Sequence, residues 1–319
     1  MRLCILDNDI LDGHLAETCS SFGAMFVRLF DRAGVDWRMD IFNTQRGQYP
    51  ASFDDFDAVL LTGSRADSFS DAPWAVELRR RVTTLLETRK KMVGVCFGHQ
   101  LIALCMGAAV GRAPQGWGAG RMAYQWLDAD FPQAAGRSEI ALLASHQDQV
   151  FELPRGATLV ARSAFCPVAA FTVGNAVFCI QPHPEFQEEV SAYLLEKHRE
   201  ILGEEKYIAA RSSLKQGHEG DHVARMLMAR YGPQANPDDL VTLRCDETLS
   251  IVDVARRSNA VVLTVLAVAA DLVPLNVVPA LNATARFGLV TLSRRQEAPA
   301  LRIVREQLPG WVAAMGEKA

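Results

Sequence analysis

The sequence predicts an α/β fold in which an open, mostly parallel sheet is flanked by helices. Short apolar runs alternate along the chain with longer segments of helical periodicity, which is typical of strands joined by helical crossovers. Two of the apolar runs end in polar segments, at residues 7–9 and 62–64, and sites form at such strand ends. With 319 residues, the chain is long enough for one domain of this class and a smaller one.

The first half of the predicted sheet needs four strands and two long helices. The expected strands are residues 3–6, 36–42, 58–61 and 92–95. A helix is predicted from 17 to 33, because Gly34 ends its pattern. The other helix is predicted from 74 to 88, with Asp71 as its N-cap and Pro73 in its first turn.

The second half has a different pattern. Residues 109–130 are rich in glycine and tryptophan, which fits loops and short strands near a site mouth or a plain hairpin. Successive antiparallel strands are expected at 157–161, 169–173 and 176–180. Helices are expected at 186–201 and 222–231, and the polar segment 211–221 between them is predicted to be a flexible or lid-like loop.

The chain is expected to divide near residue 235. Residues 233–237 contain two prolines and are predicted to be a linker between a domain at 1–235 and an extension at 240–319. The extension shows a strand, helix, strand, helix pattern with a large apolar content. Because it is too small to bury that surface alone, we expect it to dock on the first domain or to form a homodimer.

Composition excludes several classes of partner. The formal net charge of -4 and the pI near 6.0 give no basic footprint, so no nucleic acid is expected. The apolar run 260–279 is interrupted by Asp271 and Pro274, so no membrane span is expected. Seven scattered cysteines without CxxC spacing argue against a disulfide framework or a zinc site. Together with the lack of a signal peptide after Met1, they predict a cytoplasmic protein.

Cys96 is the best candidate nucleophile. It falls at the junction of a predicted strand and a predicted helix, with Gly94 and Gly98 two residues to either side. This is the spacing of a nucleophile elbow, in which a sharp turn leaves no room for a Cβ at the flanking positions. The N–H groups at the start of the following helix favour a thiolate at Cys96. The alternative is a core cysteine beside two packing glycines.

His183 and Glu185 can supply the base and the group that orients it. They lie two residues apart in a segment where Pro182 and Pro184 favour extended backbone, so both side chains project to the same side. A carboxylate there can hold the tautomer of the imidazole and stabilise its cation.

The other histidines are weaker candidates. His99 is expected to have a structural role on the helix after Cys96, and His146 is expected to line the pocket without acting as the base. The remaining four are expected to be solvated; they are His14, His198, His218 and His222.

Thioester chemistry also needs donors for an oxyanion. The N–H of Phe97 is one natural donor, because it follows the nucleophile. The N–H of Gly63 is a natural second donor, because Gly63 follows another strand end and can turn without steric cost.

These motifs together resemble class I glutamine amidotransferase domains over roughly residues 1 to 235. The resemblance is carried by four segments in the family's order, namely residues 60–64, 94–100, 145–150 and 181–185. The chain is similar to the stand-alone branch that looks like the glutaminase half of GMP synthase. Through residues 70–74 and 111–117 it is similar to plant-type γ-glutamyl peptidases. The family fold is a flavodoxin-like sheet.

The resemblance implies a role for each candidate residue. It implies Cys96 as nucleophile, His183 as base and Glu185 as its orienter, with Gly63 and Phe97 as oxyanion donors. The substrate, glutamine or another small γ-glutamyl compound, is expected to contact Ser64, Gln100 and His146. No cofactor is expected.

The family resemblance does not identify the acceptor in the reaction, which is either water or a separate synthetase that receives ammonia. No phosphate-binding loop or nucleotide fingerprint of a synthetase is found in the sequence, so we favour hydrolysis of a γ-glutamyl amide or peptide. The alternatives are an amidotransferase subunit that supplies ammonia to a separate synthetase, and a non-catalytic sensor of a γ-glutamyl compound. Residues 240–319 resemble the tail of a LysR-type effector-binding domain, without a DNA-binding helix-turn-helix, so no role in transcription follows.

Overall fold

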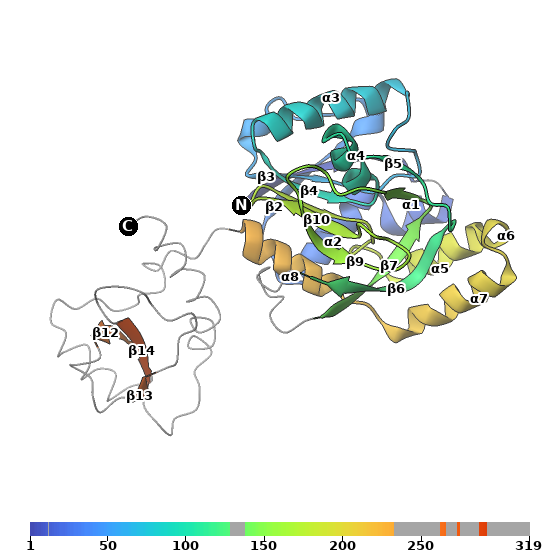
Figure 1. Cartoon of the computed structure of the whole chain (residues 1–319). Coiled ribbons are helices and arrows are strands. Elements are labelled where there is room, and N and C mark those ends of the chain that lie inside the picture. Colours follow the sequence, from blue (N-terminus) through green and yellow to red (C-terminus); the bar gives the residue numbers. More distant parts are fainter. Residues whose placement is uncertain (12, 128–137, 233–261, 266–272, 275–286, 292–319) are drawn as a thin grey trace. The chain divides into compact units, whose positions relative to one another are not determined.

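A computed structural model of the chain describes residues 1–11, 13–127, 138–232, 262–265, 273–274 and 287–291. The chain divides into two compact units, Met1–Gln234 and Ala235–Ala319. Figure 1 labels helices and strands of both units.

The first unit is built on a nine-stranded sheet in the order β2-β1-β3-β4-β11-β10-β9-β6-β7. Its strands are β1 (Arg2–Asp7), β2 (Arg38–Asn43), β3 (Ala58–Leu61), β4 (Lys91–Val95), β6 (Gly118–Trp126), β7 (Glu139–His146), β9 (Thr158–Arg162), β10 (Ala170–Val173) and β11 (Val177–Ile180). In this sheet order, neighbouring strands are parallel from β2 as far as β11 and antiparallel from β11 as far as β7. Two further short strands, β5 (Val110–Arg112) and β8 (Asp148–Val150), pair with each other. The predicted α/β class and the antiparallel run after residue 157 are therefore confirmed.

Helices cover both faces of this sheet. They are α1 (Gly13–Cys19), α2 (Phe22–Arg32), α3 (Pro73–Glu87), α4 (Phe97–Cys105), α5 (Glu188–Lys197), α6 (Arg199–Leu202), α7 (Glu204–Ser213) and α8 (Gly220–Tyr231). Short 3₁₀ turns lie at Thr44–Arg46, Phe53–Asp55 and Leu214–Gln216. Helices α3 and α4 pack on one face, while α2 and α8 pack together on the other (Figure 1).

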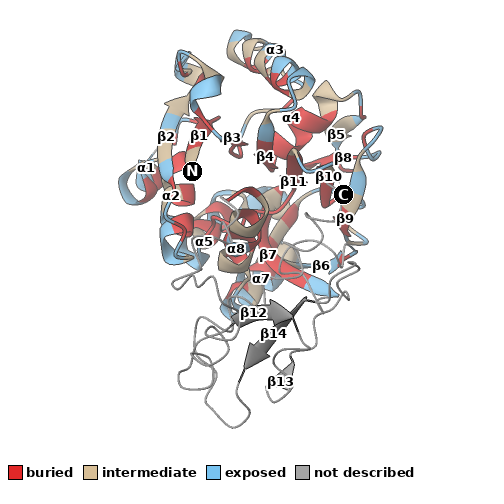
Figure 2. Cartoon of the chain, turned by 90° about the vertical axis from the view of Figure 1, so that its left-hand side faces the viewer, coloured by how far each residue is buried: buried red, intermediate tan, exposed pale blue. Residues whose placement is uncertain are grey.

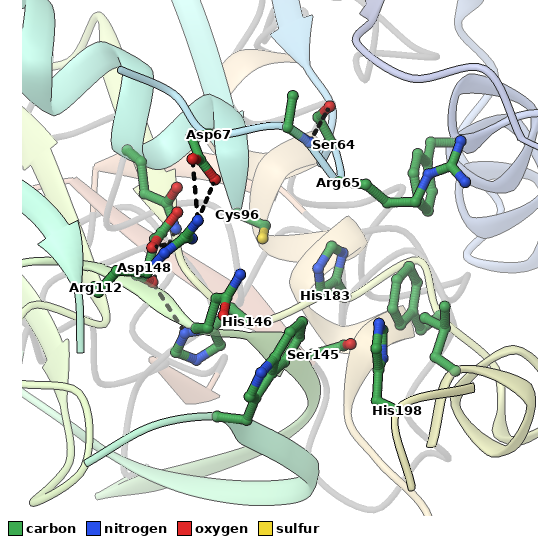
Figure 3. Close-up of a pocket in the computed structure, with 17 residues that line it drawn as sticks. Ser64, Arg65, Asp67, Cys96, Arg112, Ser145, His146, Asp148, His183 and His198 are labelled. Carbon is green, nitrogen blue, oxygen red and sulfur yellow. Dashed lines mark hydrogen bonds and ion pairs between the residues drawn. The ribbon is translucent and has the colours of Figure 1, made fainter. Parts of the chain in front are cut away.

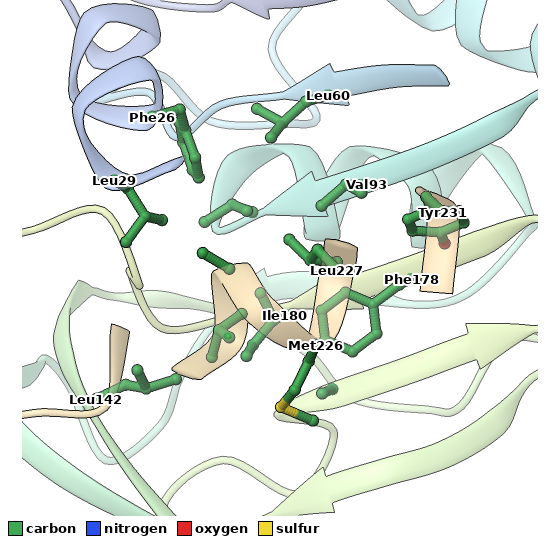
Figure 4. Close-up of a cluster of buried hydrophobic side chains, with 14 of the residues drawn as sticks. Phe26, Leu29, Leu60, Val93, Leu142, Phe178, Ile180, Met226, Leu227 and Tyr231 are labelled. Atoms are coloured by element: carbon green, nitrogen blue, oxygen red, sulfur yellow. The ribbon is translucent and has the colours of Figure 1, made fainter. Parts of the chain in front are cut away.

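The two cores follow from the alternation of side chains along the central strands. In β3, Leu60 faces α2 and α8, whereas Leu61 faces α3 and α4. Val93 of β4 and Ile180 of β11 share the side of Leu60, where Phe26 of α2 packs (Figure 4). Both faces of these strands are covered, so β3 and β11 are buried along their whole length (Figure 2).

The helix predicted from 17 to 33 is two helices. Ser20 adopts a left-handed backbone with φ 65°, which ends α1. Ser21 then caps α2, because its Oγ accepts a hydrogen bond from the N–H of Ala24 at 3.1 Å. The prediction was wrong because two serines inside an amphipathic pattern do not by themselves identify a break.

Three other local predictions also need correction. Ala72, not Asp71, is the N-cap of α3, although Pro73 does begin the helix. The predicted helix 186–201 is divided into α5 and α6. The segment 211–221 is mostly helical, since α7 ends at Ser213, a 3₁₀ turn follows, and α8 starts at Gly220. The predicted lid-like loop is therefore wrong.

The described part of the second unit is a small antiparallel sheet. It has the order β12-β14-β13, formed by β12 (Val262–Val265), β13 (Val273–Pro274) and β14 (Phe287–Thr291). The linker predicted at 233–237 and the helices predicted in this unit lie outside the described residues. Among the helices that the structure describes, none is long and apolar enough to cross a membrane.

Candidate active site

Cys96 lies at the junction of β4 and α4 in a strained conformation. Its φ of 50° and ψ of −103° are rare for a residue with a side chain. A Cβ on Gly94 would lie 2.7 Å from the carbonyl oxygen of Gly98, and a Cβ on Gly98 would lie 2.5 Å from the carbonyl oxygen of Leu61. Both glycines are therefore required by close backbone contacts, as the spacing around Cys96 predicts.

His183 and Glu185 lie beside Cys96 and are buried. The Nδ1–H of His183 donates to Oε1 of Glu185 over 2.7 Å, and the backbone N–H of His183 donates to Leu143 in β7 over 2.8 Å. Burial opposes the charged imidazolium, but the charges of Glu185 and Cys96 and hydrogen bonds to both groups outweigh it. Together they raise the pKa of His183 from 6.5 to about 10. The arrangement favours an imidazolium next to the sulfur.

Two phenylalanines hold the imidazole in place. The ring of Phe186 stacks on His183 with centroids 3.8 Å apart and an interplanar angle of 10°. Phe22, the first residue of α2, stacks on Phe186 at 5.9 Å. This contact depends on the break before α2, and the helical pattern of residues 17–33 does not predict it.

The segment that follows β3 lies next to both Cys96 and His183. A Cβ on Gly63 would be 2.7 Å from Cε1 of His183 and 3.7 Å from the Cβ of Cys96. Among the described residues, none accepts a hydrogen bond from the N–H of Gly63. Phe97 is the first residue of α4, so its N–H has no acceptor within the helix. Two backbone donors are therefore available beside the sulfur.

A pocket of about 220 Å³ opens over the sulfur of Cys96. Figure 3 shows Cys96 and His183 near the centre, with an ion-pair cluster on one side and His198 on the other. The pocket is lined by residues from loops, helices and strands, namely Phe22, Ser64, Arg65, Ala66, Asp67, Cys96, Gln100, Arg112, Trp117, Ser145, His146, Gln147, Asp148, His183, Phe186, Leu194 and His198.

The ion-pair cluster joins three segments of the pocket wall. Arg112 of β5 lies 2.6 Å from Asp148 of β8 and 2.9 Å from Asp67 in the loop after β3. Burial raises the pKa of Asp148 even though Arg112 lowers it. Because the side chain of Arg112 is half exposed, the cluster presents charge to whatever enters the pocket.

An aromatic pair forms the opposite wall. The rings of Trp117 and His198 stack with centroids 4.5 Å apart. Burial, with the nearby charge of Lys197, lowers the pKa of His198, so its ring is neutral. His198 was predicted to be solvated; in the structure it is half-buried in the pocket wall.

The structure places the three expected substrate contacts in this pocket. Ser64 lines it, and its Oγ accepts a hydrogen bond from Ala66. Gln100 is buried and donates through Nε2 to the backbone oxygen of Asp148 and to Gln181. His146 donates from Nδ1 to the backbone oxygen of Asp148, and burial lowers its pKa to about 4. His146 is therefore neutral at pH 7, with Nε2 as an acceptor.

His99 is fully buried on α4 and packs against Phe171 with ring centroids 5.2 Å apart. It does not line the pocket, in agreement with its predicted structural role. Among the residues that the structure describes, no group of three or more His, Cys, Asp or Glu side chains could hold a metal ion.

The sequence reasoning missed several pocket residues, among them Arg65, Asp67, Arg112, Trp117, Asp148 and His198. Signals existed for three of them: Asp148 lies in the segment 145–150 that carries the family resemblance, and Arg112 and Trp117 lie in the glycine- and tryptophan-rich residues 109–130, for which a site mouth and a plain hairpin were equally good interpretations. The structure decides for the site mouth, because Arg112 and Trp117 line the pocket.

Comparison with known proteins gives one family and two kinds of relative. The profile described as glutamine amidotransferase class-I matches residues 15–198. Gamma-glutamyl peptidase 3 of Arabidopsis thaliana is 36% identical over 182 residues, which cover 54% of this chain and 72% of that protein. The glutamine-hydrolysing GMP synthase of Bordetella avium is 31% identical over 156 residues, which cover 46% of this chain and only 28% of that protein.

Among solved structures, a glutamine amidotransferase from Thermotoga maritima has the same fold. It superposes with a TM-score of 0.58 at 20% sequence identity, covering 72% of this chain and 95% of that one.

Proposed function

The chain belongs to the class-I glutamine amidotransferase family, and on that premise we propose that it hydrolyses a γ-glutamyl amide or peptide through a γ-glutamyl thioester. One observation carries the proposal. The strained Cys96 faces the buried His183–Glu185 pair, and the free N–H groups of Gly63 and Phe97 lie beside it. The similarity to a γ-glutamyl peptidase supports this choice of substrate class.

In the proposed reaction, the thiolate of Cys96 attacks the γ-carbonyl carbon, and the resulting oxyanion accepts hydrogen bonds from Gly63 and Phe97. The imidazolium of His183 then gives its proton to the leaving amine as the C–N bond breaks. Water next attacks the thioester while His183 takes its proton, which releases glutamate and restores the thiolate. Glu185 holds the Nδ1–H throughout, so that Nε2 exchanges protons with the reacting groups.

The γ-glutamyl group has suitable partners in the pocket. Both hydrogen bonds of Gln100 use its Nε2, so its amide oxygen is left to accept from the substrate's α-ammonium group. We propose that Nε2 of His146 is a second acceptor and that the hydroxyl of Ser64 is a further contact. The leaving group then lies between the Arg112 cluster and the Trp117–His198 pair.

The test is glutamate release by the purified protein from glutamine and from a panel of γ-glutamyl dipeptides. Turnover that is abolished by Cys96→Ala, with a γ-glutamyl adduct on Cys96 in the mass spectrum of the wild-type protein, would support the proposal. The matched control is Cys105→Ala, which removes a cysteine from the far end of α4 and should leave turnover intact. Absence of glutamate release from every substrate, with an intact thiol, would refute the proposal.

The second candidate is supply of ammonia to a separate synthetase. The match to the glutamine-hydrolysing GMP synthase favours this candidate. This chain aligns with 28% of that protein, so the remainder would have to be supplied by a separate partner. The substrate panel separates the two candidates: a peptidase releases glutamate from γ-glutamyl dipeptides, whereas an amidotransferase subunit accepts only glutamine. A sensor would keep its ligand response in the Cys96→Ala variant.

We further propose that the protein is cytoplasmic and that the second unit forms a homodimer. Free thiols at all six cysteines of the described ranges fit a reducing compartment. The large apolar content of residues 240–319 in so short an extension favours pairing with a second copy. Sedimentation of the full chain tests the dimer, and a monomer at micromolar concentration would refute it.

A further inference from the structure

The segment after β1 is hydrogen-bonded to the segment that carries Gly63. Asn8 is fully buried, and its backbone N–H donates to Oγ1 of Thr62 over 2.9 Å. The side-chain Nδ2 of Asn8 donates to the carbonyl oxygen of Thr62 over 3.0 Å. Both contacts fix the residue that immediately precedes Gly63.

The orientation of the Asn8 amide follows from its partners. A carbonyl oxygen can only accept, so the nitrogen of the amide must face Thr62. On the other side, the hydroxyl of Thr44 lies 3.0 Å from Oδ1 of Asn8 and donates to it. The amide is therefore held at both ends inside the protein.

The hydrogen bond from Asn8 to the Thr62 carbonyl determines where the N–H of Gly63 points. In a trans peptide the C=O and N–H groups point in opposite directions, so a Thr62 carbonyl held by Asn8 turns the Gly63 N–H away from Asn8. Thr62 also donates its hydroxyl to the carbonyl oxygen of Gly63 over 3.0 Å, which fixes the next peptide plane. Arg65 is anchored in turn, because its backbone N–H donates to Oδ2 of Asp9 over 2.8 Å.

Without such an anchor, the Thr62–Gly63 peptide could rotate at little steric cost, because glycine tolerates both orientations. A rotated peptide would direct the Thr62 carbonyl oxygen into the space that the N–H now faces. An acceptor would then replace a donor, and it would repel an oxyanion on the substrate.

We propose that Asn8 is a positioning residue that holds the Gly63 N–H in the orientation of an oxyanion donor. This inference rests on the proposed thioester chemistry. Asn8 does not line the pocket, so it acts only through the Thr62–Gly63 peptide.

The test compares Asn8→Ala with Asn43→Ala. Asn43 belongs to the same loop cluster, since its Nδ2 donates to the backbone oxygen of Asp9 over 2.7 Å, but it does not contact Thr62. For Asn8→Ala we expect kcat for γ-glutamyl hydrolysis to fall by about 10²-fold, close to the loss of one oxyanion donor, with little change in KM. The control should keep its kcat.

A second readout separates positioning from damage to the fold. Alkylation of Cys96 by iodoacetamide is a displacement at a saturated carbon, so it forms no oxyanion and depends on the thiolate and its access. Its rate and pH profile should be the same in wild type and Asn8→Ala. An unchanged kcat, or an alkylation rate that falls together with kcat, would overturn the inference.

A crystal structure of the variant decides the matter independently of turnover. If the wild-type protein releases no glutamate, the proposed function fails. A Thr62–Gly63 peptide that is rotated in the variant, or present in two orientations, would still support the role of Asn8. An unchanged peptide would refute it. If Asn8→Ala does not fold, Asn8→Leu serves for every arm, because a side chain of nearly the same shape fills the space but has no group that can donate to the Thr62 carbonyl.

Discussion

Gly63 lies so close to His183 that a Cβ there would stand 2.7 Å from Cε1 of the ring. The ring has no room to move, because Phe186 stacks on it and Glu185 holds its Nδ1. Nor can the Gly63 backbone withdraw freely, because Thr62 is fixed by Asn8. At this position a single methyl group therefore conflicts with the group proposed to be the base.

We predict that Gly63→Ala lowers kcat by at least about 10²-fold, because either the oxyanion donor or the imidazole must shift. Overpacking should also reduce the free energy of unfolding by about 1–3 kcal/mol. Steady-state kinetics and urea unfolding measure the two effects. Gly34→Ala is the control: unlike Gly63, Gly34 has a left-handed backbone, with φ 75°, but apart from its chain neighbours no atom lies within 4 Å of its Cβ position. It should cost stability without lowering kcat, and full activity in Gly63→Ala would contradict the prediction.

The raised pKa of His183 gives a prediction about stability and pH. A group whose pKa is about 10 in the folded protein and 6.5 when unfolded contributes stability that is fully present below pH 6.5. That contribution is lost as the pH rises through about 10. The difference in unfolding free energy between wild type and His183→Gln should therefore shrink from pH 6 to pH 10, as measured by urea unfolding.

The Cys96→Ala background provides the control for this experiment. Removing the sulfur removes one of the two charges that raise the pKa of His183, while Glu185 remains. The loss of stability should then occur at lower pH. In either background, the unfolding free energies of the chains with and without His183→Gln are compared. A difference between them that grows with pH would contradict the assignment of an imidazolium to His183.

At the residue scale, the sequence predicts the central chemistry but not the pocket walls. Gly94 and Cys96 are predictable because their steric reason is local to one turn, whereas the carbonyl oxygen that excludes a Cβ at Gly98 belongs to Leu61 in β3. His198 is not predictable, because only its stacking on Trp117, which is distant in sequence, makes it part of the pocket wall. The Arg112 ion pairs likewise join residues 36 and 45 positions apart, which no local pattern relates.

At the scale of elements, the break between α1 and α2 has a role in the site. Ser20 ends the first helix with a left-handed backbone, and Ser21 caps the second. As a result, the first turn of α2 brings Phe22 into the pocket, where it stacks on Phe186. An unbroken helix over residues 17–33, as the sequence pattern predicts, would not have this cap.

We predict that Ser21→Ala reduces the free energy of unfolding by about 1 kcal/mol, through loss of the hydrogen bond from Ala24. Fraying of this turn should also raise KM, because Phe22 lines the pocket. Urea unfolding and steady-state kinetics test the two parts. Ser52→Ala is the control, since Ser52 caps only a short exposed 3₁₀ turn by accepting from Asp54, and it should leave KM unchanged. An unaltered KM in Ser21→Ala would show that Phe22 does not depend on the cap.

The order of strands is also only partly predictable. The alternation of strands and helices predicts a parallel sheet, and the first five strands in sheet order are indeed parallel. Strand β11 joins them next to β4 although it is also antiparallel to β10. The pairing of β11 with β4 brings His183 beside Cys96, although the two residues are 87 positions apart in the sequence. The residue pattern of neither strand specifies this pairing.

At the scale of the whole molecule, the described residues of the candidate site all belong to the first unit. Every residue that lines the pocket lies between Phe22 and His198, and the first unit extends to Gln234.

We predict that a chain truncated after Gln234 keeps kcat/KM for γ-glutamyl substrates within about threefold of the full chain, well under 1 kcal/mol of transition-state stabilisation. Steady-state kinetics on both chains give the comparison. A truncated chain that folds, as judged by circular dichroism, but loses activity would show that the second unit supports the site.

The three strands that carry the site are neighbours at the centre of the sheet. Gly63 follows β3, Cys96 follows β4 and His183 follows β11, and adjacent strands are about 4.8 Å apart. Buried central strands exchange their amide hydrogens only when the whole domain opens, so the proposed catalytic residues at their ends should stay together as long as the sheet does. We therefore expect heat inactivation and melting to be one event, and the working lifetime of the enzyme at any temperature to equal the lifetime of its fold.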